Sequence, residues 1–557
     1  MNCFDQCTSL EEIIIPSSVD SINESCFNDC VSLQKVSFEM PSSIAKLKCY
    51  MFKGCISLTD ITIPTSVTSA QWNIFDGCSS LKKIEIPSSI ISISERFFNN
   101  CTSLTDVVLP PSIKTINIFA FSGCISLKHI EIPQSVINIY DNAFDNCSSL
   151  TEISLPLSMN KVAGGLFKGC TSLENVFLNN INSIFSEAFE NCTSLKQIYI
   201  PPSVISISKF AFAGCSSLVK VEIPHLVTKI QNSCFAGCSS LTEINILSQI
   251  TQIEDFAFEN CSKLKDFTIP SSVNYIGKSA FQGCSTLTKI IIPESVTKIL
   301  SFTFNGCSSL KEIILPPSIY FIGKYAFSRC SSLIEIVIPS MMTNNTESSF
   351  EGNVSNTLNE IGPGAFRDCV SLRGLHLTNI SYIGSHAFDG CTSLANVILP
   401  NTLKIINSQS FYNCTSVTKV IIPSSICEIG FYAFTGCSSL KKIIIPSSVT
   451  KIGTCAFGKC SSLKELEISS SLTEIEPKVF LECTSLEQIK IPSSVIRIWD
   501  CAFKDCISLK DVSIPSSVNK IGNEAFEGCI SLKKVSIPIN IEIEFNSFPK
   551  HTEISFY

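Results

Sequence analysis

The residues of this sequence best suited to chemistry are its 30 cysteines and five histidines. A cysteine thiolate can bind zinc, form a disulfide or act as a nucleophile. Three pairs have Cys-x-x-x-Cys spacing: Cys3/Cys7, Cys26/Cys30 and Cys234/Cys238. No second pair and no histidine stands at the spacing of a zinc site beside them. We therefore predict neither a metal site nor a bound cofactor.

Most of the cysteines instead mark one position of a repeat. The pattern Phe-x-x-Cys runs from Phe4/Cys7 to Phe526/Cys529 in 23 copies, with a step of 23 residues almost everywhere. Stacked copies would hold their Cβ vectors parallel, which suits a disulfide poorly. A small buried thiol also packs like an apolar side chain. The pattern predicts a column of buried free thiols, which favours a reducing compartment or burial that resists oxidation.

Catalytic motifs are missing from the sequence. It contains no Gly-x-Ser-x-Gly, phosphate-binding loop or His-Glu-x-x-His. Acidic residues such as Asp60, Asp106 and Glu152 recur once per repeat, as on a solvated face. Catalysis needs converging groups in a pocket, whereas a regular repeat offers a long open surface. The sequence predicts that this protein is not an enzyme.

Residues 440–462 show the elements that each repeat must contain. Leu440, Ile443 and Ile445 alternate with outward residues, as in a short strand that Pro446 ends. A Ser-Ser turn follows, and residues 449–452 suit a second, shorter strand. Gly453 suits a tight corner, and we expect the next residues to form one helical turn. A single such coil buries its apolar residues only by stacking on neighbouring coils.

Composition excludes two classes of partner. Hydrophobic residues make up 45% of the 557 residues, but the apolar runs are short and end at proline and serine. None reaches the roughly 18 residues of a transmembrane helix, and no signal-peptide pattern is visible at the start. The net charge of −7 lacks the concentrated basic face that nucleic acid requires. We predict no transmembrane segment and no nucleic-acid partner.

The unit LxxIxIPxxVxxIGxxAFxxCxSL, as in residues 440–463 and 509–532, closely resembles the BspA-type leucine-rich repeat. The resemblance covers essentially the whole chain. It implies a leucine-rich-repeat solenoid. Members of this family are known mainly as surface or secreted proteins of bacteria and parasitic protists. The resemblance therefore also implies adhesion to host cells or to matrix proteins such as fibronectin.

The expected fold is a β-rich solenoid, a right-handed leucine-rich-repeat superhelix of about 23–24 coils. We expect a parallel concave β-sheet, short convex strands and single helical turns. Residues 1–557 form one solenoid domain, and residues 538–557 a degenerate C-terminal repeat or cap. The step from Cys330 to Cys369 is 39 residues, which predicts an inserted loop at 340–357. This loop is either a tolerated surface insertion or a recognition loop.

A candidate partner surface lies on the outward middle residue of the first strand. Seven consecutive coils carry six aliphatic residues there and one histidine: Ile291, Ile314, Val337, His376, Ile398, Ile421 and Ile444. The inserted loop adds Phe350 at its tip, and Phe177 with Tyr199 forms a smaller second candidate. β-branched residues suit any strand, but a contiguous exposed apolar patch also suits protein binding. Both interpretations stay open.

The predicted function is a non-catalytic protein-binding scaffold. The family resemblance favours a cell-surface, adhesin-like protein that recognises host or matrix proteins through the concave face. The alternative is an intracellular scaffold that docks signalling or cytoskeletal partners, which the thiols and the lack of a visible signal peptide favour. The location, at the surface or in the cytoplasm, stays open. The chain starts in mid-coil, which also suggests end-to-end self-association.

Overall fold

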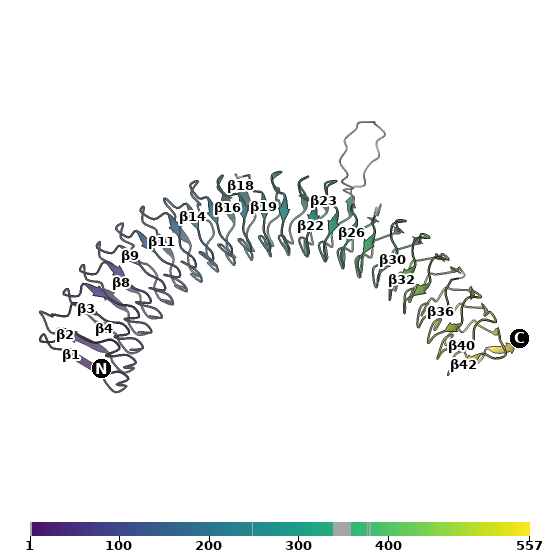
Figure 1. Ribbon diagram of the computed structural model, residues 1–557, viewed down its shortest axis with the longest axis horizontal. Coiled ribbons are helices and arrows are strands. Elements are labelled where there is room, and N and C mark those ends of the chain that lie inside the picture. The colour runs from purple at the N-terminus through teal and green to yellow at the C-terminus, as the bar shows by residue number, and fades with distance from the viewer. Residues whose placement is uncertain (1–2, 248, 338–357, 376, 378–379, 470) are drawn as a thin grey trace, which may run out of the picture. The chain divides into compact units, whose positions relative to one another are not determined.

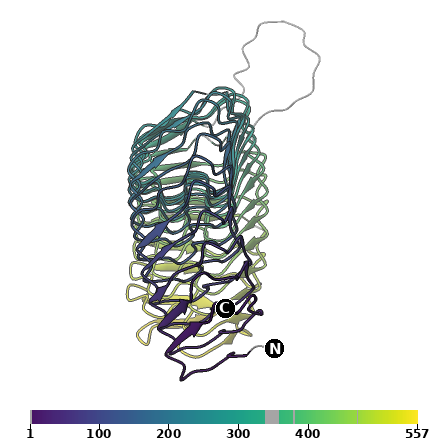
Figure 2. The same cartoon turned by 90° about the vertical axis from the view of Figure 1, so that its left-hand side faces the viewer.

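The computed structural model describes residues 3–247, 249–337, 358–375, 377, 380–469 and 471–557 (Figure 1). The chain divides into two compact units, Met1–Lys265 and Asp266–Tyr557. Each unit is a stack of coils, and most coils contribute a first strand of two to four residues and a second strand of two residues. In Figure 2 the purple coils of the first unit lie one behind another, with arrows marking their strands.

The strands of each unit form two columns that run through its stack. In the first unit the first strands are β1 (Glu12–Ile15), β2 (Lys35–Phe38), β4 (Asp60–Ile61), β6 (Lys83–Glu85), β8 (Asp106–Val108), β11 (Glu152–Ser154), β13 (Asn175–Phe177), β16 (Lys220–Ile223) and β18 (Glu243–Ile246). The second strands are β3 (Lys46–Leu47), β5 (Ser69–Ala70), β7 (Ser92–Ile93), β9 (Thr115–Ile116), β10 (Asn138–Ile139), β12 (Lys161–Val162), β14 (Ser183–Ile184), β15 (Ser206–Ile207), β17 (Lys229–Ile230) and β19 (Gln252–Ile253).

The second unit repeats this arrangement. Its first strands are β21 (Lys289–Ile291), β23 (Glu312–Ile314), β25 (Glu335–Val337), β27 (Gly374–Leu375), β29 (Asn396–Ile398), β31 (Lys419–Ile421), β33 (Lys442–Ile445), β35 (Glu465–Ile468), β37 (Gln488–Lys490), β39 (Asp511–Ser513), β41 (Lys534–Ile537) and β43 (Glu553–Phe556). Its second strands are β20 (Tyr275–Ile276), β22 (Lys298–Ile299), β24 (Phe321–Ile322), β26 (Glu360–Ile361), β28 (Tyr382–Ile383), β30 (Ile405–Ile406), β32 (Glu428–Ile429), β34 (Lys451–Ile452), β36 (Glu474–Ile475), β38 (Arg497–Ile498), β40 (Lys520–Ile521) and β42 (Glu542–Ile543).

The strands pair in parallel with corresponding strands of neighbouring coils, in sheets of two to four strands. Lys442 lies opposite Glu465, one repeat further along, and Ile445 lies opposite Ile468. The side chains at Ile443 and Ile445 are buried, whereas those at Lys442 and Ile444 are exposed. The alternation expected from the sequence is confirmed in this strand. Because the register is one repeat, equivalent side chains of successive coils lie side by side on the same face.

The corner that follows the second strand differs from the expected helical turn. Within the described residues no helix occurs, and this corner is a run of hydrogen-bonded turns. We call the phenylalanine of each Phe-x-x-Cys motif the column phenylalanine. The residues two before and two after it have left-handed backbone angles, as at Cys455 and Lys459, both with φ of 58°. A right-handed helix needs φ near −60° at every residue. The helical expectation was therefore wrong, because two left-handed residues interrupt each corner.

The left-handed residues also turn their backbone toward the next coil. The N–H of Cys455 donates to the carbonyl of Pro477 at 3.1 Å, and that of Lys459 to Leu481 at 2.7 Å. The corner is therefore a third ladder between coils, beside the two strand columns. Gly, Asn or Asp commonly precedes the column cysteine, as at Gly436 and Asn413, because these residues adopt left-handed angles at low cost.

Phenylalanine rings form the centre of the core. Phe411 is fully buried and stacks on Phe388 at 5.4 Å and on Phe434 at 5.3 Å between ring centroids. Most column thiols donate to a phenylalanine carbonyl of the preceding coil, as from Cys414 Sγ to Phe388 O at 3.1 Å. Burial raises the pKa of the Cys437 thiol to about 12. The buried thiols of this column therefore stay protonated at neutral pH.

Serine hydroxyls satisfy carbonyls that the strands leave without partners. In many coils the serine two residues after the strand-ending proline donates to the coil before it, as from Ser112 to Ile90 O at 2.9 Å and from Ser318 to Val296 O at 2.7 Å. Among the described residues, the buried hydroxyls of Ser425, Ser448, Ser494 and Ser517 at the same position have no such partner. A buried carbonyl without a partner would cost free energy comparable to a lost hydrogen bond. Where this hydrogen bond forms, the segment after the strand-ending proline ties its coil to the preceding one.

Candidate partner-binding surface

An aliphatic strip crosses the first strands of the second unit. We define it by its five isoleucines with described side chains, which are each between 43% and 61% exposed: Ile291, Ile314, Ile398, Ile421 and Ile444. Ile291 lies opposite Ile314 in the sheet β21-β23-β25-β27, and Ile398 lies opposite Ile421 in the sheet β29-β31-β33-β35. The strand geometry thus presents these side chains outward, as the sequence predicts.

The other residues predicted for this surface are only partly described. Val337 belongs to β25 and its backbone lies opposite Ile314, but its side chain is outside the description. His376, Phe350 and the inserted residues 340–357 lie outside the described residues. Whether they belong with the strip stays a prediction.

Charged pairs border the aliphatic strip on the same strands. The ammonium of Lys289 lies 2.9 Å from a carboxylate oxygen of Glu312. Lys442 lies 2.8 Å from Glu465 and 3.1 Å from Glu467, and Glu467 stands opposite Ile444, where the strip ends. Such exposed pairs contribute little stability. An apolar centre with a charged border is the usual anatomy of a protein interface.

A shallow groove of about 450 Å³ lies at one end of the strip. It is lined by Ile421 and Ile444, with Pro446 at one side and Lys419 and Lys442 at the other. Lys419 stands opposite Lys442 in the parallel register, so two cations neighbour the apolar floor. Sequence reasoning found the two isoleucines, but not the groove or its lysines, because these depend on the register between coils.

The second candidate, Phe177 and Tyr199, lies in the first unit. Both rings are exposed, Phe177 by 55% and Tyr199 by 70%. They line one groove of about 400 Å³ together with Asn175, Gln197 and Glu222. The structure therefore brings these two aromatic residues together, as the sequence predicts. It also surrounds them with polar groups that sequence reasoning did not single out.

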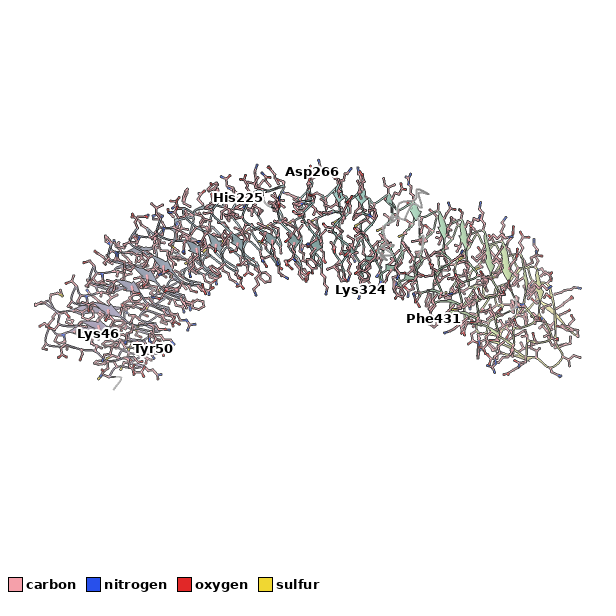
Figure 3. The ribbon with its side chains drawn as sticks, turned by 45° about the horizontal axis from the view of Figure 1, so that its top comes forward. Lys46, Tyr50, His225, Asp266, Lys324 and Phe431 are labelled. Carbon is pink, nitrogen blue, oxygen red and sulfur yellow. The ribbon has the colours of Figure 1, made fainter. Side chains whose placement is uncertain are left out.

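Sequence reasoning missed a further group of aromatic residues at the corners of the second unit, of which Phe302 and Tyr325 are half-buried and Phe431 is exposed. Phe302 and Tyr325 stack at 5.3 Å, and the ammonium of Lys451 lies 6.0 Å from the ring of Phe431. Figure 3 shows Lys324 and Phe431 along one margin of this unit, away from Asp266 in the first-strand column. Phe302 and Tyr325 each stand two positions before a column phenylalanine, and this shared position was the sequence signal that could have identified them.

Two other kinds of site depend on particular residues: metal centres and membrane-spanning helices. Among the described residues, no cluster of three or more His, Cys, Asp or Glu side chains is placed to hold a metal ion. No helix in the described part of the chain is long and apolar enough to cross a membrane.

Comparison with protein families matches the chain repeatedly to the BspA type leucine rich repeat region. Six copies match, at residues 1–126, 114–242, 176–287, 228–357, 359–486 and 428–555. The chain belongs to the BspA-type leucine-rich-repeat family. The resemblance seen in the sequence and the expected parallel β-solenoid are thereby confirmed. Membership supports a repeat scaffold for protein binding.

Solved structures with similar chains are also leucine-rich-repeat proteins. One is a leucine-rich repeat protein from Bacteroides ovatus, with 26% identity over 76% of this chain and 88% of that chain, and a TM-score of 0.44. Another is a leucine rich cell surface protein from Faecalibacterium prausnitzii, with 24% identity over 83% and 87%, and a TM-score of 0.21. No curated protein matches the chain. The family assignment rests on the repeat itself and not on these superpositions.

Proposed function

We propose that this BspA-type solenoid is a non-catalytic protein-binding scaffold and that the aliphatic strip is its main partner surface. The observation that carries the proposal is the exposure of five isoleucines at the same position of their first strands, in two runs: Ile291 with Ile314, and Ile398 with Ile421 and Ile444. Each isoleucine keeps about half of its side chain in water, at a cost of roughly 25 cal/mol per Å² of apolar area. A bound partner would remove that cost.

The dimensions of the strip also suit a protein partner. Strands of one sheet lie about 4.8 Å apart, so the seven coils from Ile291 to Ile444 extend over roughly 30 Å. A standard interface buries about 800 Å² on each partner, which a surface of this length and its charged border can provide. The backbone ladders on both sides of each coil hold the isoleucines in place. Little ordering of the scaffold is therefore needed on binding.

A triple substitution tests the aliphatic strip. Ile314, Ile398 and Ile421 changed together to threonine keep β-branched side chains, so the strands should persist. We expect binding to immobilised fibronectin or to fixed epithelial cells to weaken by more than about tenfold, because three apolar contacts at the centre are lost. Surface plasmon resonance and cell-binding assays measure the effect, and circular dichroism checks the fold.

The matched control changes Ile14 and Val108 to threonine. Both residues occupy the same outward strand position in the first unit and are exposed to similar extents, 66% and 50%. This control variant should bind as the wild type does. If the triple variant is folded and also binds like the wild type, the strip reflects strand propensity alone and the partner surface lies elsewhere.

The finer proposal is a cell-surface, adhesin-like role that recognises host or matrix proteins, and membership of the BspA-type family supports it. The buried thiol column favours a second candidate, an intracellular scaffold for signalling or cytoskeletal partners, because reducing compartments preserve thiols. The two candidates place the same strip in contact with different partners.

Labelling of intact cells separates these two candidates. The protein exposes many lysines, such as Lys289 and Lys442, which an amine-reactive biotin reagent that does not cross membranes would modify. For an adhesin we expect biotinylation without lysis, followed by capture on streptavidin and detection by mass spectrometry. A cytoplasmic protein labelled in parallel reports leakage. Complete protection in intact cells, with labelling after lysis, contradicts the adhesin role and supports the intracellular scaffold.

A further inference from the structure

Phe177 and Tyr199 occupy the same outward strand position in two consecutive coils of the first unit. Phe177 ends β13, opposite Ser154 of β11, and Tyr199 stands in the coil that follows β13. Both rings line the groove of about 400 Å³, whose volume lies within the range of small-molecule sites, about 300–1,000 Å³. This groove belongs to the first unit and is lined by aromatic and polar residues, whereas the aliphatic strip belongs to the second unit.

Most polar neighbours of the two rings are either uncharged or paired with an opposite charge. Asn175 and Gln197 present exposed amides, which both donate and accept hydrogen bonds. The ammonium of Lys220 is held 2.6 Å from a carboxylate oxygen of Glu243, and this hydrogen bond raises the pKa of the lysine. Glu222 adds an exposed carboxylate that accepts hydrogen bonds and repels anions. The groove therefore suits an uncharged ligand rich in hydroxyl groups.

The two rings supply the complementary apolar contact. The face of an aromatic ring carries partial negative charge, so it attracts the slightly positive C–H groups on one face of a pyranose. Neighbouring strands lie about 4.8 Å apart, close to the length of one pyranose unit, so successive sugars can stack on successive rings. Hydroxyl groups at the edge of each sugar would then reach the amides and Glu222. A purely aliphatic surface offers none of these hydrogen bonds.

We propose that Phe177 and Tyr199, together with Asn175, Gln197 and Glu222, form a binding site for a neutral oligosaccharide. The exposed rings stack on the sugar faces, and the amides and the carboxylate bind the hydroxyl groups. This site does not depend on the aliphatic strip or on a protein partner. A scaffold with both surfaces binds a protein and a glycan through different units.

Titration of the whole protein with soluble neutral trisaccharides tests the site. The probes are cellotriose, mannotriose and chitotriose, and the measurements are saturation-transfer difference NMR and isothermal titration calorimetry. We expect saturable binding of at least one probe, with a dissociation constant in the millimolar range or tighter. The double variant Phe177→Ala, Tyr199→Ala should weaken that binding by more than about tenfold, as for other aromatic hot spots.

Two further variants show what the rings contribute. Tyr199→Phe keeps the stacking face and should retain most of the affinity, and Val108→Ala alters an equally placed exposed residue and should change nothing. Circular dichroism confirms that each variant is folded. The proposal is overturned if none of the three probes binds saturably, or if the double variant binds as tightly as the wild type. Tighter binding of a sulfated trisaccharide would also overturn it, because the site would then select anions.

Discussion

Raising the pH from 8 to 10 is expected to destabilise this protein severely, because its buried thiols would have to unfold in order to ionise. In the second unit burial raises the pKa of nine column thiols: Cys307, Cys330, Cys369, Cys391, Cys414, Cys437, Cys460, Cys483 and Cys506. For Cys437 the pKa rises from 9.0 to about 12. The folded state therefore holds protons that the unfolded state releases.

The sign of the effect follows from that difference. Below pH 9 both states keep the thiol proton, so the stabilisation is fully present. Between pH 9 and the raised pKa only the unfolded chain loses the proton, so stability falls as the pH rises. At pH 10 each such thiol lowers the free energy of unfolding by about 1.4 kcal/mol. Nine thiols together approach the whole stability of an ordinary domain, about 5–15 kcal/mol.

Urea titrations between pH 7.5 and 10.5, under a reducing agent, measure this loss. The midpoint should fall steeply above pH 9. A variant with Cys414, Cys437 and Cys460 changed to alanine is the control, because it releases three fewer protons on unfolding. This variant should be less stable than the wild type at pH 7.5. Between pH 8 and pH 10, however, its free energy of unfolding should fall by about 4 kcal/mol less than that of the wild type. Equal losses in both proteins would show that the column thiols do not couple to unfolding.

Replacing Phe411 by alanine is expected to lower the free energy of unfolding by about 3–5 kcal/mol. The ring is fully buried and stacks on Phe388 and Phe434, so its removal leaves a cavity between three coils. Each coil of a repeat protein is stabilised by its neighbours. The defect therefore weakens the interfaces on both sides, and urea unfolding followed by circular dichroism measures the loss.

Phe431→Ala serves as the matched control for the buried ring. Phe431 lies in the next coil and is 48% exposed, and the centre of its ring is 6.0 Å from the ammonium of Lys451. Its substitution should cost less than about 1 kcal/mol, as for most surface positions. Similar losses for the two variants would contradict the assignment of the phenylalanine column as the main stabilising element.

The repeat pattern alone was sufficient to predict the parallel solenoid. Apolar residues at Leu440, Ile443 and Ile445 can be buried only on the inside of a coil, and a step of 23 residues brings equivalent residues into register. The exposure of Ile291, Ile314 and Ile398 follows from the same alternation, so these residues could be predicted too. Such features depend on local periodicity and on stacking, both of which are visible in a sequence.

Other features became visible only in three dimensions. The left-handed angles at Cys455 and Lys459 replace the expected helical turn, because their N–H groups bond to the next coil and not within their own. The lysines beside Ile421, and the amides and Glu222 around Tyr199, come together through contacts between coils. A sequence shows which side of a strand each residue occupies. The neighbours that a side chain meets across the stack are decided by the register and by the packing of successive coils, which only the tertiary structure contains.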